Sequence, residues 1–185
     1  MVNITKALTV DGWMSPLELE WLAEQAQHGI VVEIGSWMGR TTRAIADSKI
    51  DGQIFAVDTW KGSQENQDFL KDKPHGYLFK QFCDNLSEHI ASGLVIPLRL
   101  PSLKAAEHFS SVGIKLDMVF LDASHEYPDI HADILAWRRL VKLGGLICGH
   151  DYDLGWPGVV SAVRELISPT PDQAAGGSSI WYTRT

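Results

Sequence analysis

Residues Ile30 to Asp47 read IVVEIGSWMGRTTRAIAD, and this stretch decides the fold. It begins with a β-branched apolar run, breaks at Gly35 and Gly39, and resumes with the spacing of a helix. This order predicts a buried strand, a tight loop and a helix. Glycines let the backbone turn sharply and approach a ligand, and the helix start offers free N–H groups beside the Thr41 and Thr42 hydroxyls. We therefore expect the loop to bind a nucleotide-like ligand.

The length and composition of the chain predict one globular domain. The chain has 185 residues, of which 45% are hydrophobic and 21% are charged. It shows no apolar run near the roughly 18 residues of a membrane span and no start that resembles a signal peptide, so we expect a cytoplasmic protein. A net charge of −7 without basic clusters argues against nucleic acid and anionic membranes as partners. Cys83 and Cys148 lack metal-ligand spacing, which favours free thiols.

Strand patterns and helix patterns alternate along the whole chain. The predicted strands are residues 30–34, 53–58, 95–100, 118–122, 145–149 and 179–183, and the predicted helices are residues 16–28, 43–47, 79–90, 102–109, 128–141 and 157–167. This alternation predicts a mostly parallel, twisted sheet with helices on both faces and an antiparallel last strand. We expect a single domain over residues 1–185, with a helical segment at 1–29, a ligand-binding core at 30–167 and a terminal strand at 168–185.

Several local signals refine this prediction. Ser15 to Glu18 has the form of a capping box with proline at the first helical position. Pro97 favours an edge position for its strand, because proline cannot donate to a ladder. Residues 59–74 are polar and aperiodic, which predicts a long loop and a candidate lid. Trp21 and Trp137 have core spacing, and Ser102 is a plausible N-cap.

Polar side chains follow four of the predicted strands. They are Glu33, Asp58, Asp122 and the pair His150 and Asp151. Because the carboxyl ends of parallel strands meet at one edge of a sheet, we expect these groups to converge. An acid at the end of the second strand is placed to accept hydrogen bonds from both ribose hydroxyls of a nucleoside. The sequence therefore predicts a nucleoside site at this edge.

The spacing of the glycine loop separates alternative ligands. The loop reads Glu33-x-Gly35-x-x-x-Gly39 and lacks the GxGxxG pattern that brackets a pyrophosphate. An NAD-dependent or other nucleotide enzyme on a similar sheet is thus the weaker alternative. A non-catalytic binding protein that keeps only the ligand pocket is a second alternative, from a different functional class.

The ordered motifs resemble a known family. Residues 33–39 together with Val57-Asp58 resemble the first two cofactor motifs of class I S-adenosylmethionine-dependent methyltransferases. Residues 120–125 with Gly144-Gly145 and residues 150–152 resemble, more narrowly, the small-molecule O-methyltransferases allied to macrocin O-methyltransferases and cephalosporin-hydroxylase-associated proteins. The resemblance covers residues 30–167. It implies transfer of a methyl group to a hydroxyl of a small metabolite, such as a sugar or natural-product intermediate, with a homodimer as one assembly to consider.

The resemblance also implies roles for individual residues. Gly35, Ser36 and Gly39 would lie against the methionine part of the cofactor, with Glu33 supporting the loop. Asp58 would hold the ribose, Thr59 and Trp60 would flank it, and Ser102 would border the adenine. Thr41 at the helix start and Asp122 after the fourth strand complete the expected cofactor contacts.

The residues for metal binding and proton removal fall after the fourth and fifth strands. In related metal-dependent enzymes an aspartate and an acidic pair at these places bind Mg²⁺, and the matching candidate ligands here are Asp122, His150 and Asp151. One expected carboxylate is thus a histidine, whereas magnesium prefers oxygen. His125 and His150 are candidate bases for the acceptor hydroxyl, with Asp151 beside them, because an imidazole titrates near neutral pH.

Overall fold

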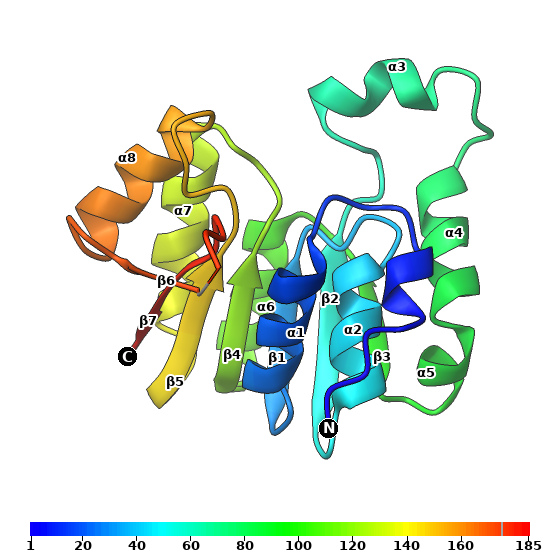
Figure 1. Cartoon of the computed structure of the whole chain (residues 1–185), viewed down its shortest axis with the longest axis horizontal. Coiled ribbons are helices and arrows are strands. Elements are labelled where there is room, and N and C mark those ends of the chain that lie inside the picture. The colour runs from blue at the N-terminus through cyan, green and yellow to red at the C-terminus, as the bar shows by residue number, and fades with distance from the viewer. Residues whose placement is uncertain (175) are drawn as a thin grey trace.

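The computed structural model describes residues 1–174 and 176–185. Within them the strands form one sheet of order β3-β2-β1-β4-β5-β7-β6. Its strands are β1 (Ile30–Ile34), β2 (Gln53–Asp58), β3 (Val95–Arg99), β4 (Leu116–Leu121), β5 (Val141–Gly149), β6 (Asp172–Gln173) and β7 (Trp181–Arg184). β1 to β5 are parallel, and β7 is antiparallel to β5 and to β6 (Figure 1). The predicted parallel sheet, its antiparallel last strand and the edge position of Pro97 in β3 are confirmed.

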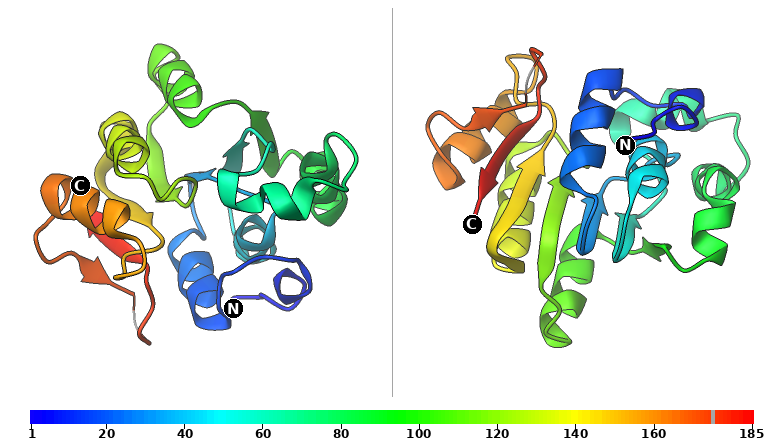
Figure 2. Two further views of the ribbon diagram at one scale, coloured as in Figure 1. Left: turned by 90° about the horizontal axis from the view of Figure 1, so that it is seen from above. Right: turned by 60° about the horizontal axis from the view of Figure 1, so that its bottom comes forward.

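Helices cover both faces of the sheet (Figure 2). They are η1 (Ala7–Thr9), α1 (Pro16–Gln25), α2 (Arg40–Ser48), η2 (Gln64–Asn66), α3 (Gln67–Leu70), α4 (Tyr77–Asn85), α5 (Ser87–Ala91), α6 (Ser102–Ser111), α7 (Tyr127–Arg138) and α8 (Pro157–Leu166). α1, α2 and α4 enclose one apolar core, which includes Leu22, Ile45 and Phe82. α6, α7 and α8 enclose the other, which includes Trp137 and Val163. The burial of apolar side chains on both faces is the main force that holds the layers together.

The start of α1 confirms the predicted capping box. The Ser15 side chain accepts a hydrogen bond from the backbone N–H of Glu18. The Glu18 carboxylate in return accepts from the backbone N–H of Ser15 at 2.9 Å and from its hydroxyl at 2.8 Å. A cap of this kind stabilises a helix by about 1 kcal/mol. Glu18 is only 8% exposed, which is unusual for a glutamate in the first turn of a helix.

The segment after β2 contains more structure than its sequence predicts. Where a loop was expected, η2 and α3 form, and α3 stands apart above the carboxyl edge of the sheet (Figure 1). The turn is held by Ser63, whose hydroxyl donates to Asn66 Oδ1 at 2.7 Å. Phe69 packs against Trp37, with ring centroids 6.0 Å apart. Side-chain contacts with distant parts of the chain, and not local propensity, therefore stabilise this short helix.

Two further expectations need correction. The N-cap of α6 is Pro101, because the Ser102 hydroxyl is used elsewhere: it donates to Asp133 and accepts from the indole N–H of Trp137 at 2.8 Å. Trp137 is fully buried as predicted, but Trp21 is only partly buried and lies against Tyr182, with ring centroids 5.1 Å apart. Both cysteines are free, as expected.

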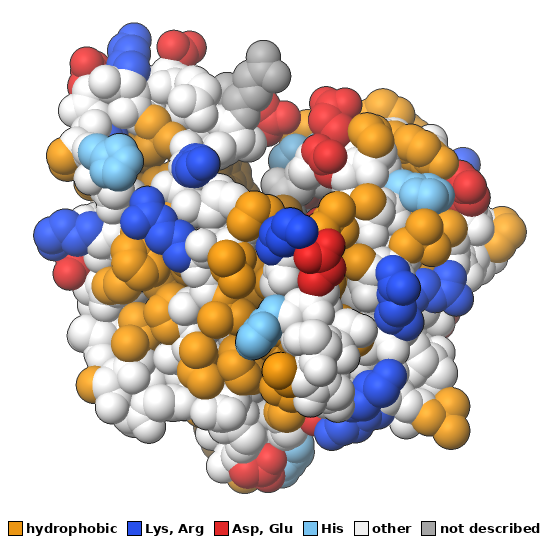
Figure 3. All heavy atoms as spheres, turned by 180° about the vertical axis from the view of Figure 1, so that it is seen from behind, with side chains coloured by type: hydrophobic (Ala, Val, Ile, Leu, Met, Phe, Trp, Pro, Cys, Tyr) orange, Lys and Arg blue, Asp and Glu red, His pale blue; other side chains and the backbone are white. Residues whose placement is uncertain are grey.

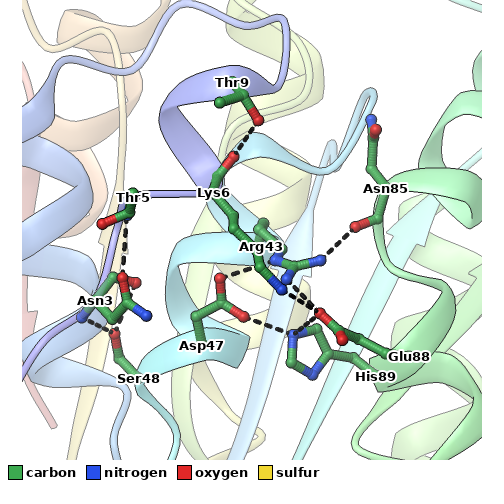
Figure 4. A network of polar contacts seen from close by, with 10 residues as sticks. All are labelled: Asn3, Thr5, Lys6, Thr9, Arg43, Asp47, Ser48, Asn85, Glu88 and His89. Atoms are coloured by element: carbon green, nitrogen blue, oxygen red, sulfur yellow. Dashed lines mark hydrogen bonds and ion pairs between the residues drawn. The ribbon is translucent and has the colours of Figure 1, made fainter.

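A polar network ties α2 to α5 and to the N-terminal segment (Figure 4). Arg43 is buried, and its guanidinium donates to Asp47 Oδ2 at 2.8 Å, to the carbonyl of Asn85 at 2.8 Å and to the carboxylate of Glu88. His89 completes the network with Nε2 at 2.8 Å from Asp47 Oδ1. The buried carboxylate of Asp47 is thus paired, which its burial requires.

In the described part of the chain, no helix is long and apolar enough to cross a membrane.

Candidate functional site

A cavity of about 1160 Å³ lies at the carboxyl edge of the parallel strands. Its walls come from the segments that follow all five parallel strands, β1 to β5, together with residues 11–14. The chain reverses its order across the sheet between β1 and β4, and open α/β sheets bind ligands at such a point. Figure 3 shows a hollow between two upper lobes of the molecule, with acidic side chains along its edge. This cavity contains most of the residues that the sequence singled out.

Gly35 allows the first loop to pass close to the backbone after β4. Its φ is 90°, and a Cβ at this position would lie 2.1 Å from the carbonyl oxygen of Asp122. The contact persists because Gly35 N–H donates to Val57 and Asp122 N–H donates to Ile34, both at 2.9 Å. Any other residue at position 35 would therefore separate the loop from β4.

Beside Gly35, two side chains have donors without partners. The Ser36 hydroxyl and the Trp37 indole N–H are buried and make no hydrogen bond within residues 1–174 and 176–185. Both residues line the cavity, and buried donors of this kind normally have a partner. The loop thus has a glycine backbone that a ligand can approach closely, and two unused hydrogen-bond donors. Both features suit a polar ligand that contains a nucleoside.

The carboxylate of Asp58 is fixed at the end of β2. It accepts from the backbone N–H of Trp37 at 2.9 Å and from that of Trp60 at 2.7 Å. Burial raises the pKa of Asp58, and these hydrogen bonds oppose the shift. Trp37 and Trp60 both have positive φ, 48° and 50°, a strained conformation for a bulky residue. The strain is concentrated where two loops turn to hold one acid at the cavity wall.

Not every predicted contact residue reaches the cavity. Gly35, Ser36, Thr41, Asp58, Thr59, Ser102 and Asp122 line it. Gly39 faces Leu86 instead, since a Cβ there would lie 2.7 Å from Leu86 Cδ1. Trp60 is buried behind the wall and donates its indole N–H to the carbonyl of Trp37 at 2.7 Å. The structure shows packing contacts for Gly39 and Trp60, and their cofactor contacts stay predictions.

Glu33 lies beneath the loop, as the expectation of a supporting role requires. It is 1% exposed, and the Thr42 hydroxyl donates to its carboxylate. Burial, which favours the neutral form, raises the pKa of Glu33 to about 7. The side chain joins β1 to α2 across the glycine loop.

The polar groups after β4 and β5 meet in one cluster. His125 Nε2 lies 2.9 Å from Asp151 Oδ2. His150 Nδ1 lies 3.1 Å from Asp151 Oδ1 and 3.8 Å from Asp122 Oδ1. Asp151 has a φ of 63°, so its carboxylate is presented to both histidines from a left-handed backbone. Of the five groups expected at the strand ends, Asp122, His150 and Asp151 thus lie together, and Asp58 lines the same cavity.

The cluster shifts the pKa of each member. Hydrogen bonding to Asp151 raises the pKa of His125. Burial lowers the pKa of His150, but its hydrogen bonds to Asp151 and Glu18 outweigh burial and raise it to about 10. Asp151 shifts the other way: burial is outweighed by the two histidines, and its pKa falls well below the usual range. Burial raises the pKa of Asp122 to about 7.

The donor chemistry of the cluster suits a borderline divalent cation. One atom each from Asp122, His150 and Asp151 lies within 4.8 Å of the others. Two carboxylate oxygens and one imidazole nitrogen are a mixed set, whereas Mg²⁺ favours oxygen alone. A second group of Asp47, Glu88 and His89 has similar spacing, but the Arg43 guanidinium already neutralises it.

Sequence reasoning missed two residues of the site: Trp13, which lines the cavity, and Glu18, which contacts a lining histidine. Trp13 lies over Trp37, with ring centroids 5.3 Å apart, and Glu18 reaches His150 Nε2 at 3.3 Å. Trp156 also lines the cavity and stacks on His125, with ring centroids 3.8 Å apart. Glu18 was hidden because its capping box already explained an acid at this place. The position of Trp13 depends on Arg40, which donates to the carbonyls of Val10 and Met14.

Comparisons with known proteins agree with this geometry. The sequence model of a family described as methyltransferase domain matches residues 32–152. A search of curated proteins found no match. Among solved structures, the O-methyltransferase TomG from Streptomyces achromogenes, involved in tomaymycin synthesis and bound to SAM, is 18% identical; the match covers 100% of this chain and 92% of that one, with a TM-score of 0.69.

Two further solved structures share the fold. An O-methyltransferase from Bacillus cereus in complex with SAH is 15% identical, with 97% of this chain and 86% of that one covered and a TM-score of 0.66. CalS11, a TDP-rhamnose 3′-O-methyltransferase of calicheamicin biosynthesis, is 17% identical, with 91% and 77% covered and a TM-score of 0.64. At these identities the similarity shows a common fold.

Proposed function

This chain belongs to the methyltransferase domain family, and on that premise we propose that it transfers a methyl group from S-adenosylmethionine to a hydroxyl of a small metabolite. The observation that carries the proposal is the meeting of Gly35, Asp58 and the His125–Asp151 pair at one cavity. The first two suit a nucleoside with an amino-acid tail. The third suits removal of a proton from an acceptor.

The cofactor would lie along the loops after β1 and β2. Gly35 and Ser36 would contact its methionine part, with Thr41 at the start of α2. Asp58 would accept hydrogen bonds from the ribose hydroxyls, and Thr59 would flank the sugar. Ser102 would border the adenine, since it lines the cavity at the start of α6.

His125 is the base that we propose for the acceptor hydroxyl. Its Nε2 is hydrogen-bonded to Asp151, which fixes the ring, and its Nδ1 points away from that carboxylate. Because the cofactor carries an activated leaving group, the protein has to position the oxygen and accept its proton. The hydroxyl oxygen then forms the new bond to the methyl carbon, the carbon–sulfur bond breaks, and the proton moves to His125.

His150 and Asp122 complete the electrostatic environment. We assign the His150 imidazolium to stabilising the negative charge that develops at the acceptor oxygen, and Asp122 to pairing with His150 at the cavity wall. A divalent cation held by Asp122, His150 and Asp151 would, when bound, lower the pKa of the acceptor hydroxyl.

The charge of the cavity indicates the class of acceptor. Among the described lining residues the acids outnumber the bases; they are Asp11, Asp58, Glu65, Asp122, Glu126, Asp129 and Asp151. Arg40 is the lining arginine, and it donates to the carbonyls of Met14 and Val10, so it is committed to the backbone. A phosphate group would meet negative charge here. We therefore propose a neutral or cationic hydroxylated acceptor, such as a sugar or a natural-product intermediate, with Trp156 and Trp37 offering faces for a ring.

Calorimetry and turnover together test the proposal. S-adenosylmethionine and S-adenosylhomocysteine should bind the full chain, and NAD should not; the opposite pattern would favour the dehydrogenase alternative. Incubation with labelled methyl donor and a panel of hydroxylated metabolites should then give labelled product. Binding without turnover across a broad panel would favour a non-catalytic binding protein.

The cellular setting remains our proposal as well. We propose that the protein acts in the cytoplasm on a small molecule, without a nucleic acid or membrane partner, because its net charge is −7 and its sequence shows no basic cluster. The single domain over residues 1–185 and the homodimer stay predictions. Sedimentation would test the assembly.

A further inference from the structure

We propose that the cluster of Asp122, His150 and Asp151 binds a borderline transition metal such as Mn²⁺ in preference to Mg²⁺, and that Glu18 on α1 is the positioning residue for His150. This proposal rests on the proposed function only because both concern the same cavity. Glu18 lies on α1, before residues 32–152, the part of the chain that matches the family model.

The first step is the direction in which His150 faces. Its Nδ1 is the nitrogen near Asp151 Oδ1, at 3.1 Å, and near Asp122 Oδ1, at 3.8 Å. Ligand atoms around one small cation lie at separations of this order, and the three atoms here lie within 4.8 Å of one another. Asp151 uses its other oxygen for His125, so it presents a single oxygen to the cluster.

The second step is the contact on the far side of the ring. His150 Nε2 lies 3.3 Å from Glu18 Oε1, a carboxylate 132 residues earlier in the chain. A histidine that binds a metal almost always donates its other ring N–H to a carboxylate or carbonyl, which fixes the tautomer and the ring plane. With the Nε2 proton donated to Glu18, loss of the Nδ1 proton that faces Asp151 would leave the Nδ1 lone pair directed at an ion between the two aspartates.

The third step is the rigidity of Glu18 itself. Besides the two hydrogen bonds from Ser15 in the capping box, its carboxylate accepts from the Ser178 hydroxyl at 2.8 Å. Its side chain is about 10% exposed. A carboxylate that needed only to cap α1 would have no reason to be enclosed by the segment before β7. The enclosure makes Glu18 a fixed support for His150.

The fourth step is selectivity. An imidazole nitrogen is a good ligand for Mn²⁺, Fe²⁺ and Zn²⁺. Mg²⁺ prefers oxygen ligands and gives up its bound water molecules reluctantly. Replacing one carboxylate of an all-oxygen set by His150 also removes one negative charge. Both changes weaken the binding of Mg²⁺ more than they weaken the binding of a borderline ion.

Calorimetry on the full chain tests the inference. We expect MnCl₂ to bind with one ion per chain and at least ten times more tightly than MgCl₂. His150→Asp should remove most of that preference by gaining affinity for Mg²⁺. Glu18→Gln should weaken the binding of Mn²⁺ by 10- to 100-fold, the usual effect of losing the hydrogen-bond partner of a metal-binding histidine. Glutamine still forms a capping box, so α1 should stay folded. Glu20→Gln, on an exposed position of the same helix, is the matched control and should bind as the wild type does.

Several results would overturn the inference. They are no Mn²⁺ binding by the wild type, Mg²⁺ binding of equal strength, or Mn²⁺ affinity that Glu18→Gln leaves unchanged while circular dichroism shows a folded chain. Binding of S-adenosylhomocysteine, measured on the same samples without metal, separates this outcome from failure of the proposed function. A chain that binds that compound but shows no metal preference rejects this inference alone.

Discussion

His125 Nε2 lies 2.9 Å from Asp151 Oδ2, although the two residues follow different strands. The contact holds the imidazole in one orientation over the cavity and, together with the stacked Trp156 ring, limits its rotation. An orienting carboxylate behind a histidine is the arrangement by which many enzymes keep a base ready. It is the basis for assigning proton removal to His125.

Replacing His125 by glutamine should lower the rate of methyl transfer by about 100-fold or more, the usual contribution of a positioned base. The affinity for S-adenosylhomocysteine should change little, because the cofactor residues lie after β1 and β2. Single-turnover kinetics and calorimetry measure the two quantities. His75→Gln, at an exposed position, is the control. A loss confined to cofactor affinity would show that His125 does not serve the acceptor.

Asp58→Ala should weaken binding of S-adenosylmethionine by about 1–3 kcal/mol, the scale for losing hydrogen bonds to a charged group. The carboxylate also holds the N–H groups of Trp37 and Trp60, so part of the loss would come from the loops. Calorimetry measures the affinity, with Asp72→Ala at an exposed site for comparison. Unchanged affinity would refute the assigned role.

Glu33 should make stability depend on pH. Its pKa rises from 4.5 to about 7 on folding, so the stability that its neutral form contributes is present below pH 4.5 and is lost as pH rises through 7. Glu33→Gln removes this loss, and above pH 7 the free energy of unfolding should exceed that of the wild type by up to about 3 kcal/mol. Urea unfolding at pH 5 and pH 8 measures it, with exposed Glu24→Gln as the control. A difference independent of pH would contradict the argument.

The acidic cavity predicts discrimination against phosphate. For an acceptor that is turned over, a phosphorylated derivative should show kcat/KM at least ten times lower. Glu65 lies 3.6 Å from His125 Nδ1 at the cavity wall. Glu65→Lys should reduce the difference in kcat/KM between the plain and the phosphorylated acceptor. Equal rates for the two acceptors would show that phosphate does not enter this part of the cavity. Glu107→Lys, on an exposed position of α6, controls for net charge.

The strand ends were predictable because their signal is local. A β-branched run followed by Gly35, or by Asp58 or Asp122, reports both the strand and its end, and parallel topology then brings the ends together. Gly39 shows where this reasoning stops. Its motif position predicts a ligand contact, its positive φ and its closeness to Leu86 show a packing role, and either role calls for glycine in the sequence.

The rest of the site depends on contacts between distant residues. Glu18 and His150 are 132 residues apart, and no periodicity in either segment indicates their pairing. α3 was expected as loop because its residues are polar, and Phe69 finds its partner in Trp37 only in the folded chain. Tertiary contacts of this kind override local pattern, which is why sequence reasoning placed the acids but not what surrounds them.

Ser178 and Glu18 are joined across 160 residues, and this sets the order in which the protein can mature during translation. When β4 and β5 have left the ribosome, every residue proposed for methyl transfer has already been synthesised. The free edge of β5 then still awaits β7, and Glu18 still lacks its last donor. The support for His150 is thus completed only after Ser178 has emerged, so a growing chain reaches its ligand-ready geometry later than the synthesis of its proposed catalytic residues.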